Sequence, residues 1–326
     1  GTNNTGVGFN SMFANTTGAN NVAVGYAALD ANVSNGGNTA IGDSALTNSN
    51  GGYYNTAVGY QAGDELTTGN QSVFIGRGAG HSVTTGHYNT FVGDLAGGET
   101  TTASNNTALG RDALATNTTA DNNTALGYLA LNAATTSPGN VAIGKNAMLS
   151  ATTGNGGNVI IGTNAGDAMT TAETNNALGS EALTSLTEGG NNVAIGYDAL
   201  GDITTVSSMT AVGHEALAKN TSGTLNTAVG FRALKINTTG ANNTSVGNAA
   251  LEDNTTGSNN VAVGQNALKD NTTSDYNIAV GASALATNST GAENVAMGHS
   301  ALYANTTASS NTAIGHNAMA ANTTGA

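Results

Sequence analysis

The sequence predicts an all-β fold, a parallel β-solenoid (β-roll) of nineteen coils, and three observations predict it. A short motif, clearest at residues 226–230 (Asn-Thr-Ala-Val-Gly), recurs along all 326 residues. Its glycine returns every 17 residues, apart from one interval of 18 between Gly144 and Gly162. An aliphatic residue or Met precedes that glycine in all nineteen copies, a register that a disordered low-complexity chain would not keep.

We take the motif glycine as position zero of each coil, name the coil by it, and count the other positions from it. The zero positions are Gly8, Gly25, Gly42, Gly59, Gly76, Gly93, Gly110, Gly127, Gly144, Gly162, Gly179, Gly196, Gly213, Gly230, Gly247, Gly264, Gly281, Gly298 and Gly315.

The residues before the glycine predict a short strand. Position −4 is Asn in seventeen coils and position −2 is Ala in fourteen, and this segment is too short for a helix. The glycine then predicts a turn, with a positive φ or a close approach to the next coil. Ala at +3 in every coil but the first, and Leu at +4 in twelve, predict a second short strand. A polar loop, such as residues 237–240 (Asn-Thr-Thr-Gly), leads to the next coil.

Stacking identical residues predicts ladders along the solenoid. We expect the Asn side chains at −4 to bond to one another, and Thr-Thr at +8 and +9, present in fourteen coils, to form β-branched columns. The one extra residue falls within residues 154–157 (Gly-Asn-Gly-Gly), a flexible connection that can absorb it.

Positions −2 and +4 are expected to share one packing layer. Four coils carry glycine instead of a large residue at +4, and in three of these four coils the residue at −2 is large. The swap conserves volume, as close packing requires. The glycines are Gly63, Gly80, Gly97 and Gly166; the large residues are Phe74, Phe91 and Ile160; and three of the four coils also have an apolar residue at +7, namely Leu66, Val83 and Met169.

Composition narrows the function classes. No shift in composition divides the chain, so we expect residues 1–326 to be one continuous array, a segment of a longer fibre. The absence of cysteine excludes a disulfide scaffold. A net charge of −13 argues against binding to nucleic acid or an anionic membrane, and no apolar run is long enough to span a bilayer.

Both faces of the predicted strand are apolar, because −1 and −2 point to opposite sides. The side chains of one face can fill the interior of the coil. Those of the other face are then buried only if another molecule packs against them. We therefore expect a parallel homo-oligomer, most simply a trimer, with end-to-end association as a second mode; the alternative is a monomeric solenoid with a mildly apolar flank.

The motif resembles a known group of repeats. Residues 192–199 (Asn-Val-Ala-Ile-Gly-Tyr-Asp-Ala) resemble the head repeats of trimeric autotransporter adhesins of the YadA type, and residues 55–62 followed by Thr-Thr-Gly at 67–69 are similar to repeats of phage tail-fibre proteins. The resemblance covers all nineteen coils, although adhesin heads usually have shorter ones. It implies a left-handed parallel β-roll, a homotrimer, and an adhesive or fibrous role at a cell surface or on a virion.

Two sets of residues are candidate sites. Aromatic residues and histidines at +1 suit a sugar ring, with plain stacking of surface neighbours as the alternative. This candidate contact column is Phe9, Tyr26, Tyr60, Tyr128, Tyr197, His214, Phe231, His299 and His316. Asn-x-Thr/Ser sequons mark candidate glycosylation sites, unless Asn and Thr serve turns and ladders. They are Asn15, Asn117, Asn220, Asn237, Asn254, Asn271, Asn288, Asn305 and Asn322.

The leading functional hypothesis is a structural and adhesive extracellular fibre segment, from a phage tail fibre or a bacterial surface filament, whose partners are further copies of itself and a surface glycan or host receptor. We expect no catalysis, cofactor or metal. The step from His299 to His316 is one coil, but no carboxylate occupies the same position in the neighbouring coils, which favours surface residues over a metal site. The alternative function is binding of ice or another crystal surface by the Thr ranks, although adjacent Thr-Thr points its hydroxyls to opposite sides.

Overall fold

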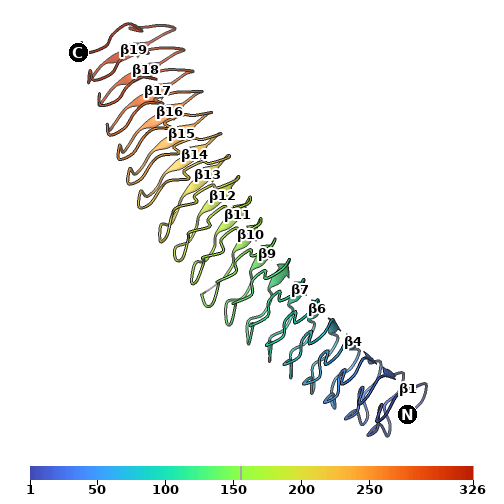
Figure 1. Cartoon of the computed structure of the whole chain (residues 1–326). Helices are drawn as coiled ribbons and strands as arrows, with labels where there is room; N and C mark the ends of the chain where they lie inside the picture. The colour runs from blue at the N-terminus through green and yellow to red at the C-terminus, as the bar shows by residue number, and fades with distance from the viewer. Residues whose placement is uncertain (155, 326) are drawn as a thin grey trace. The chain divides into compact units, whose positions relative to one another are not determined.

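A computed structural model of the chain describes residues 1–154 and 156–325. Two compact units are distinguished, Gly1–Thr163 and Asn164–Ala326. Within each unit the chain winds as a parallel β-solenoid, with one three-residue strand per coil (Figure 1). No α-helix is present among the described residues, which confirms the predicted all-β class.

The strands of the first unit are β1 (Thr5–Val7), β2 (Val22–Val24), β3 (Thr39–Ile41), β4 (Thr56–Val58), β5 (Val73–Ile75), β6 (Thr90–Val92), β7 (Thr107–Leu109), β8 (Thr124–Leu126), β9 (Val141–Ile143) and β10 (Val159–Ile161). The strands of the second unit are β11 (Asn176–Leu178), β12 (Val193–Ile195), β13 (Thr210–Val212), β14 (Thr227–Val229), β15 (Thr244–Val246), β16 (Val261–Val263), β17 (Ile278–Val280), β18 (Val295–Met297) and β19 (Thr312–Ile314).

Each strand pairs in parallel with the strand of the next coil in its unit, and equivalent residues face one another. Ala211 of β13, for example, pairs with Ala228 of β14. The register survives the longer interval, because Val141 of β9 pairs with Val159 of β10, 18 residues later. The extra residue is therefore absorbed outside the strands, as predicted for residues 154–157, of which Asn155 lies outside the described residues.

The predicted second strand is wrong. Positions +3 and +4 lie in a run of turns, because the residues at +2 and +4 adopt left-handed backbone conformations that no strand contains. In the Gly230 coil these residues are Arg232 and Leu234, with φ of 57° and 53°. A left-handed leucine is unusual for an L-residue, so these turns are held by the packing of the coil rather than by local preference.

The glycine at position zero meets both predicted requirements. Gly230 has a φ of 141°, and a Cβ placed on it would overlap the carbonyl oxygen of Gly247 in the next coil. The same overlap with the next glycine recurs at the other described zero positions that have a following coil in their unit. Glycine is thus the residue that allows successive coils to approach to a strand spacing at this corner.

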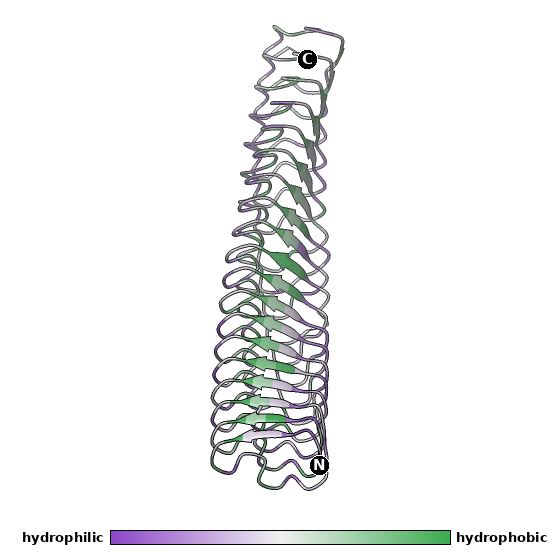
Figure 2. Ribbon diagram, turned by 90° about the vertical axis from the view of Figure 1, so that its right-hand side faces the viewer, coloured by the Kyte–Doolittle hydropathy of each residue, from purple (hydrophilic) through white to green (hydrophobic). Residues whose placement is uncertain are grey.

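The interior of each coil is filled by small and medium-sized apolar residues. Ala228 at −2, Ala233 at +3 and Leu234 at +4 are all fully buried, and their equivalents in most coils are buried too. The aliphatic residue at −1 points the other way and lies on the outer face of the strand, as the alternation of strand side chains requires. Colouring by hydropathy shows the apolar stretches concentrated on the strands (Figure 2).

The asparagine ladder forms, but its main bonds run from side chain to backbone. Asn38 donates from its backbone N to Oδ1 of Asn21 at 2.9 Å and from Nδ2 to the carbonyl of Gly52, also at 2.9 Å. Side chain to side chain bonds, such as Asn192 Nδ2 to Asn175 Oδ1 at 3.0 Å, occur beside these. Each buried amide therefore satisfies backbone groups that the turns leave without strand partners.

The shared packing layer of −2 and +4 is confirmed. The three atoms nearest to a Cβ on Gly97 would all belong to the ring of Phe91 from the same coil. A Cβ on Gly63 would lie 2.6 Å from Cδ2 of Phe74, which comes from the following coil. Phe74 thus explains the fourth glycine, Gly63, whose own coil keeps a small residue at −2. The two phenylalanines are buried and their ring centroids are 5.8 Å apart.

We expect Gly230→Ala to destabilise the solenoid by more than the roughly 1–3 kcal/mol of backbone strain alone, because the new methyl group must also push the next coil away. Gly315→Ala is the matched control, since Gly315 has a similar φ of 126° but the nearest atom to an added Cβ is 3.9 Å away. Thermal unfolding and amide hydrogen exchange of both variants measure the difference. Equal losses of stability in the two variants would show that the close approach of the next coil adds nothing to the cost of the substitution.

The packing layer predicts strong coupling between Phe91 and Gly97. Phe91→Ala should leave a cavity costing about 3–5 kcal/mol, and Gly97→Leu should overfill the layer at about 1–3 kcal/mol. The double variant recreates the common coil, in which Leu114, for example, has a φ of 54° beside Ala108. It should recover much of the loss in denaturant unfolding, whereas strictly additive effects would contradict a shared space.

Candidate functional site

The outer face of the strands carries an unbroken series of apolar side chains within each unit. Residues at −1, and the Val, Ile or Thr residues at −3, point away from the coil interior. We call these two columns the outer strand face. Its large hydrophobic members that are more than about a third exposed are Val7, Ile41, Ile75, Leu109, Leu126 and Val159 in the first unit and Leu178, Ile195, Val246, Val263, Ile278, Met297 and Ile314 in the second.

The candidate contact column at +1 lies beside this face and is solvent-exposed, from 42% for Tyr128 to 69% for Phe9 among its aromatic residues. The structure brings some of its members together. Phe9 stacks on Tyr26 with ring centroids 5.6 Å apart, and His214 lies 5.1 Å from Tyr197 and 5.4 Å from Phe231. His299 lies 5.2 Å from His316.

Tyr60 and Tyr128 are separated by charged residues of the same column. Arg77 pairs with Asp94 at 2.8 Å, and Asp94 lies 3.8 Å from Arg111, whose guanidinium lies 5.8 Å from the ring centroid of Tyr128. The aromatic residues therefore form separate short stacks rather than one continuous strip along the solenoid.

An ion cluster across three coils was not expected from the sequence. Glu215 accepts from Arg232 at 2.9 Å and from Lys235 at 2.8 Å, and Arg232 also lies 3.3 Å from Glu252. Hydrogen bonds from Lys235 and Arg232 lower the pKa of Glu215 from 4.5 to about 2. The signal was present as charges at +2 and +5 of successive coils, which become neighbours only through stacking.

The sequon asparagines lie at +7, and most of them form a second ladder inside the coils. Asn237 donates from Nδ2 to Oδ1 of Asn220 at 2.7 Å, and Asn254 donates to Asn237 at the same distance. The following bonds join Asn271, Asn288, Asn305 and Asn322. Asn117 and the asparagines from Asn220 to Asn305 are fully buried, so their amides are not accessible for glycan attachment in the folded coil. Asn15 and Asn322 are only partly buried.

The threonine column at +8 also acts within the fold. Thr238 donates from Oγ1 to the carbonyl oxygen of Thr255 at 2.9 Å, and Thr255 donates in the same way to Thr272 at 2.8 Å. These hydroxyls are therefore directed along the solenoid, and together with the asparagines they explain the sequon pattern through ladder and turn chemistry.

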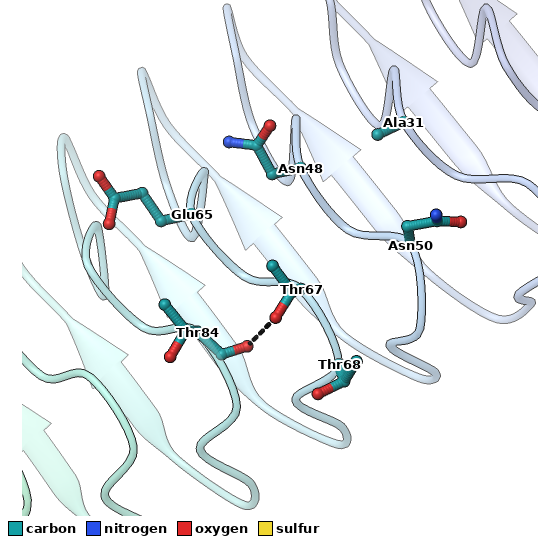
Figure 3. Close-up of a pocket in the computed structure, with 7 residues that line it drawn as sticks. All are labelled: Ala31, Asn48, Asn50, Glu65, Thr67, Thr68 and Thr84. Carbon is teal, nitrogen blue, oxygen red and sulfur yellow. Dashed lines mark hydrogen bonds between the residues drawn. The ribbon is translucent and has the colours of Figure 1, made fainter.

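The loops leave shallow hollows on the first unit. One has a volume of about 600 Å³ and lies over four successive coils (Figure 3). Its lining is Ala31, Asn48, Asn50, Glu65, Thr67, Thr68 and Thr84. A hollow of about 430 Å³ lies nearby, with His81 and Asp112 in its lining. His81 bonds through Nδ1 to Asp64, whose burial raises the pKa of its carboxyl group.

Over the described residues, no group of three or more His, Asp or Glu side chains is arranged to hold a metal ion. Nor do these residues form any helix capable of crossing a membrane.

The ion cluster predicts a pH-dependent contribution to stability. The folded pKa of Glu215 is lowered, so its pairs stabilise fully above pH 4.5 and this contribution is lost as the pH falls towards 2. Melting temperatures of wild type and Glu215→Gln should therefore differ at pH 7 and converge at pH 2. Glu188→Gln, at an exposed carboxylate, is the matched control and should follow wild type throughout. A constant gap between wild type and Glu215→Gln would contradict the assignment.

No family model, curated protein or solved structure matches the chain.

Proposed function

We propose that this chain is a structural and adhesive segment of an extracellular fibre, a phage tail fibre or a bacterial surface filament, in which left-handed coils assemble as a parallel homotrimer. The observation that carries the proposal is the outer strand face. Leu178 is 51% exposed and Ile195 is 39% exposed in the isolated chain, and aliphatic residues occupy the same place in coil after coil. A long apolar face of this kind is typical of an interaction surface.

The occupant that fits this face is a second copy of the chain. Successive strands are separated by about 4.7–4.9 Å, so apolar side chains recur at that interval. A parallel copy presents the same interval over the whole length of the contact and therefore keeps each coil in register. Burial of the outer strand face stabilises each coil by a further amount of about 25 cal/mol per Å² of apolar area.

Adhesion is assigned to the neighbouring candidate contact column. Its short stacks, such as Tyr197 with His214 and Phe231, are exposed and lie on turns rather than on the outer strand face. Exposed aromatic rings with polar edges suit a saccharide, whose CH groups pack on the ring. A glycan or a host receptor would then bind on the outside of an assembled fibre.

Binding to ice or to another crystal surface is the weaker function for this chain. It requires ordered, outward hydroxyl groups, whereas the Thr hydroxyls at +8 donate to carbonyl oxygens of the next coil. The Thr residues at +9 alone do not make a two-dimensional array.

Sedimentation tests the assembly. We expect the wild-type chain to sediment as a trimer, and a Leu109→Asn, Leu126→Asn and Leu178→Asn triple variant to dissociate, because it places amides on the outer strand face. Leu225→Asn is the matched control: Leu225 is 59% exposed, lies outside this face, and has a φ of 57° that Asn tolerates. It should remain trimeric. A wild-type monomer at all concentrations would exclude the proposal.

A further inference from the structure

We propose that His299 and His316 form a two-histidine site for a divalent transition metal, with Cu²⁺ as the ion bound most tightly. Neither the fibre proposal nor the oligomeric state enters this inference. It rests on a pair of side chains on consecutive coils of the second unit, each two residues after a strand, β18 and β19, which are drawn side by side in Figure 1.

The geometry of the pair allows chelation. The ring centroids of His299 and His316 are 5.2 Å apart and their planes differ by 34°. Two nitrogens that share an ion at about 2.0–2.1 Å each lie at most about 4 Å apart. Both side chains are exposed, so rotation about their side-chain bonds can bring ring nitrogens to that separation without disturbing the packed interior.

A ring nitrogen of His316 also has a polar neighbour. The amide Nδ2 of Asn317 lies 3.1 Å from Nε2 of His316. Imidazole binds a metal through a ring nitrogen that carries a lone pair. The contact is exposed, and water can replace it when Nε2 turns to an ion.

The ligand set determines which ion is favoured. Imidazole suits Cu²⁺, Ni²⁺ and Zn²⁺, and affinity for the same ligands rises from Ni²⁺ to Cu²⁺. No carboxylate belongs to the pair, so the oxygen ligands that Mg²⁺ and Ca²⁺ require are lacking. Water molecules would complete the coordination of an ion held by two imidazoles.

The same column contains a matched pair for a gain of function. Tyr197 and His214 also occupy +1 of consecutive coils, with ring centroids 5.1 Å apart and planes at 33°. This geometry is nearly that of His299 and His316, so Tyr197→His should create a second two-histidine site. Tyr60→His places a histidine in the same column, between coils that carry Asp43 and Arg77 at +1, and it should create none.

The full chain is first treated with a chelator and then titrated with Cu²⁺. Calorimetry and electron paramagnetic resonance measure the binding. Wild type should bind one high-affinity equivalent per chain with hyperfine coupling to two nitrogens, and should bind Ni²⁺ more weakly and Mg²⁺ not at all. His299→Gln and His316→Gln should each weaken Cu²⁺ binding at least tenfold. Tyr197→His should add a second equivalent, and Tyr60→His should not.

The outcomes separate a site from a surface stack. If either glutamine variant keeps wild-type Cu²⁺ affinity, the pair does not chelate and the proposal is overturned. If Tyr60→His adds as much binding as Tyr197→His, single histidines suffice and the paired geometry has no role. Tyr60→His and Tyr197→His lie on exposed turns. Far-ultraviolet circular dichroism will test that all the variants remain folded.

Discussion

The close approach of one coil to the next at the motif glycine is the constraint on which the rest of the structure depends. Strand pairing requires successive coils to stack at about 4.7–4.9 Å along their whole circumference. At the corner after each strand the backbones come so near that a Cβ on Gly230 would overlap the carbonyl oxygen of Gly247. Glycine has no Cβ to clash at this approach, and it also adopts the φ of 141° that the corner requires. The 17-residue period is therefore read most clearly from these glycines.

Stacking at this spacing makes the equivalent residue of the next coil the nearest neighbour of each side chain. Buried polar residues are stable only if their own type, or a backbone group, satisfies them along the column. Asn at −4 and +7 and Thr at +8 meet this condition, as the bonds of Asn38, Asn237 and Thr238 show. A fold with small interior residues thus gains ordered hydrogen bonds that partly offset the cost of ordering a thin coil.

The sequence predicted the strand before each motif glycine, its parallel register and the packing layer, because these depend on period and on side-chain volume. It did not predict the turns at +2 and +4, since a left-handed Leu234 contradicts local preference and is imposed by the coil. The sequon asparagines show a related limit. Their spacing fits glycosylation sites as well as it fits a hydrogen-bonded ladder. Only the burial of residues such as Asn254 distinguishes the two. The ion cluster around Glu215 was missed because its charges are distant in sequence.

The division between inner and outer columns explains where function can lie. An inner residue is constrained by the coils on both sides. A large residue such as Phe74 must therefore be matched by small residues in its own coil and in the preceding one. An outer residue at +1 contacts side chains beside it on consecutive coils and, as Arg111 does with Asp112, the next residue of its own coil. Aromatic, charged and imidazole pairs therefore occur in one column without altering the fold. Each local site of the solenoid is then set by a few adjacent coils, while the outer strand face, which runs through all the coils of a unit, is suited to a partner with the same repeat.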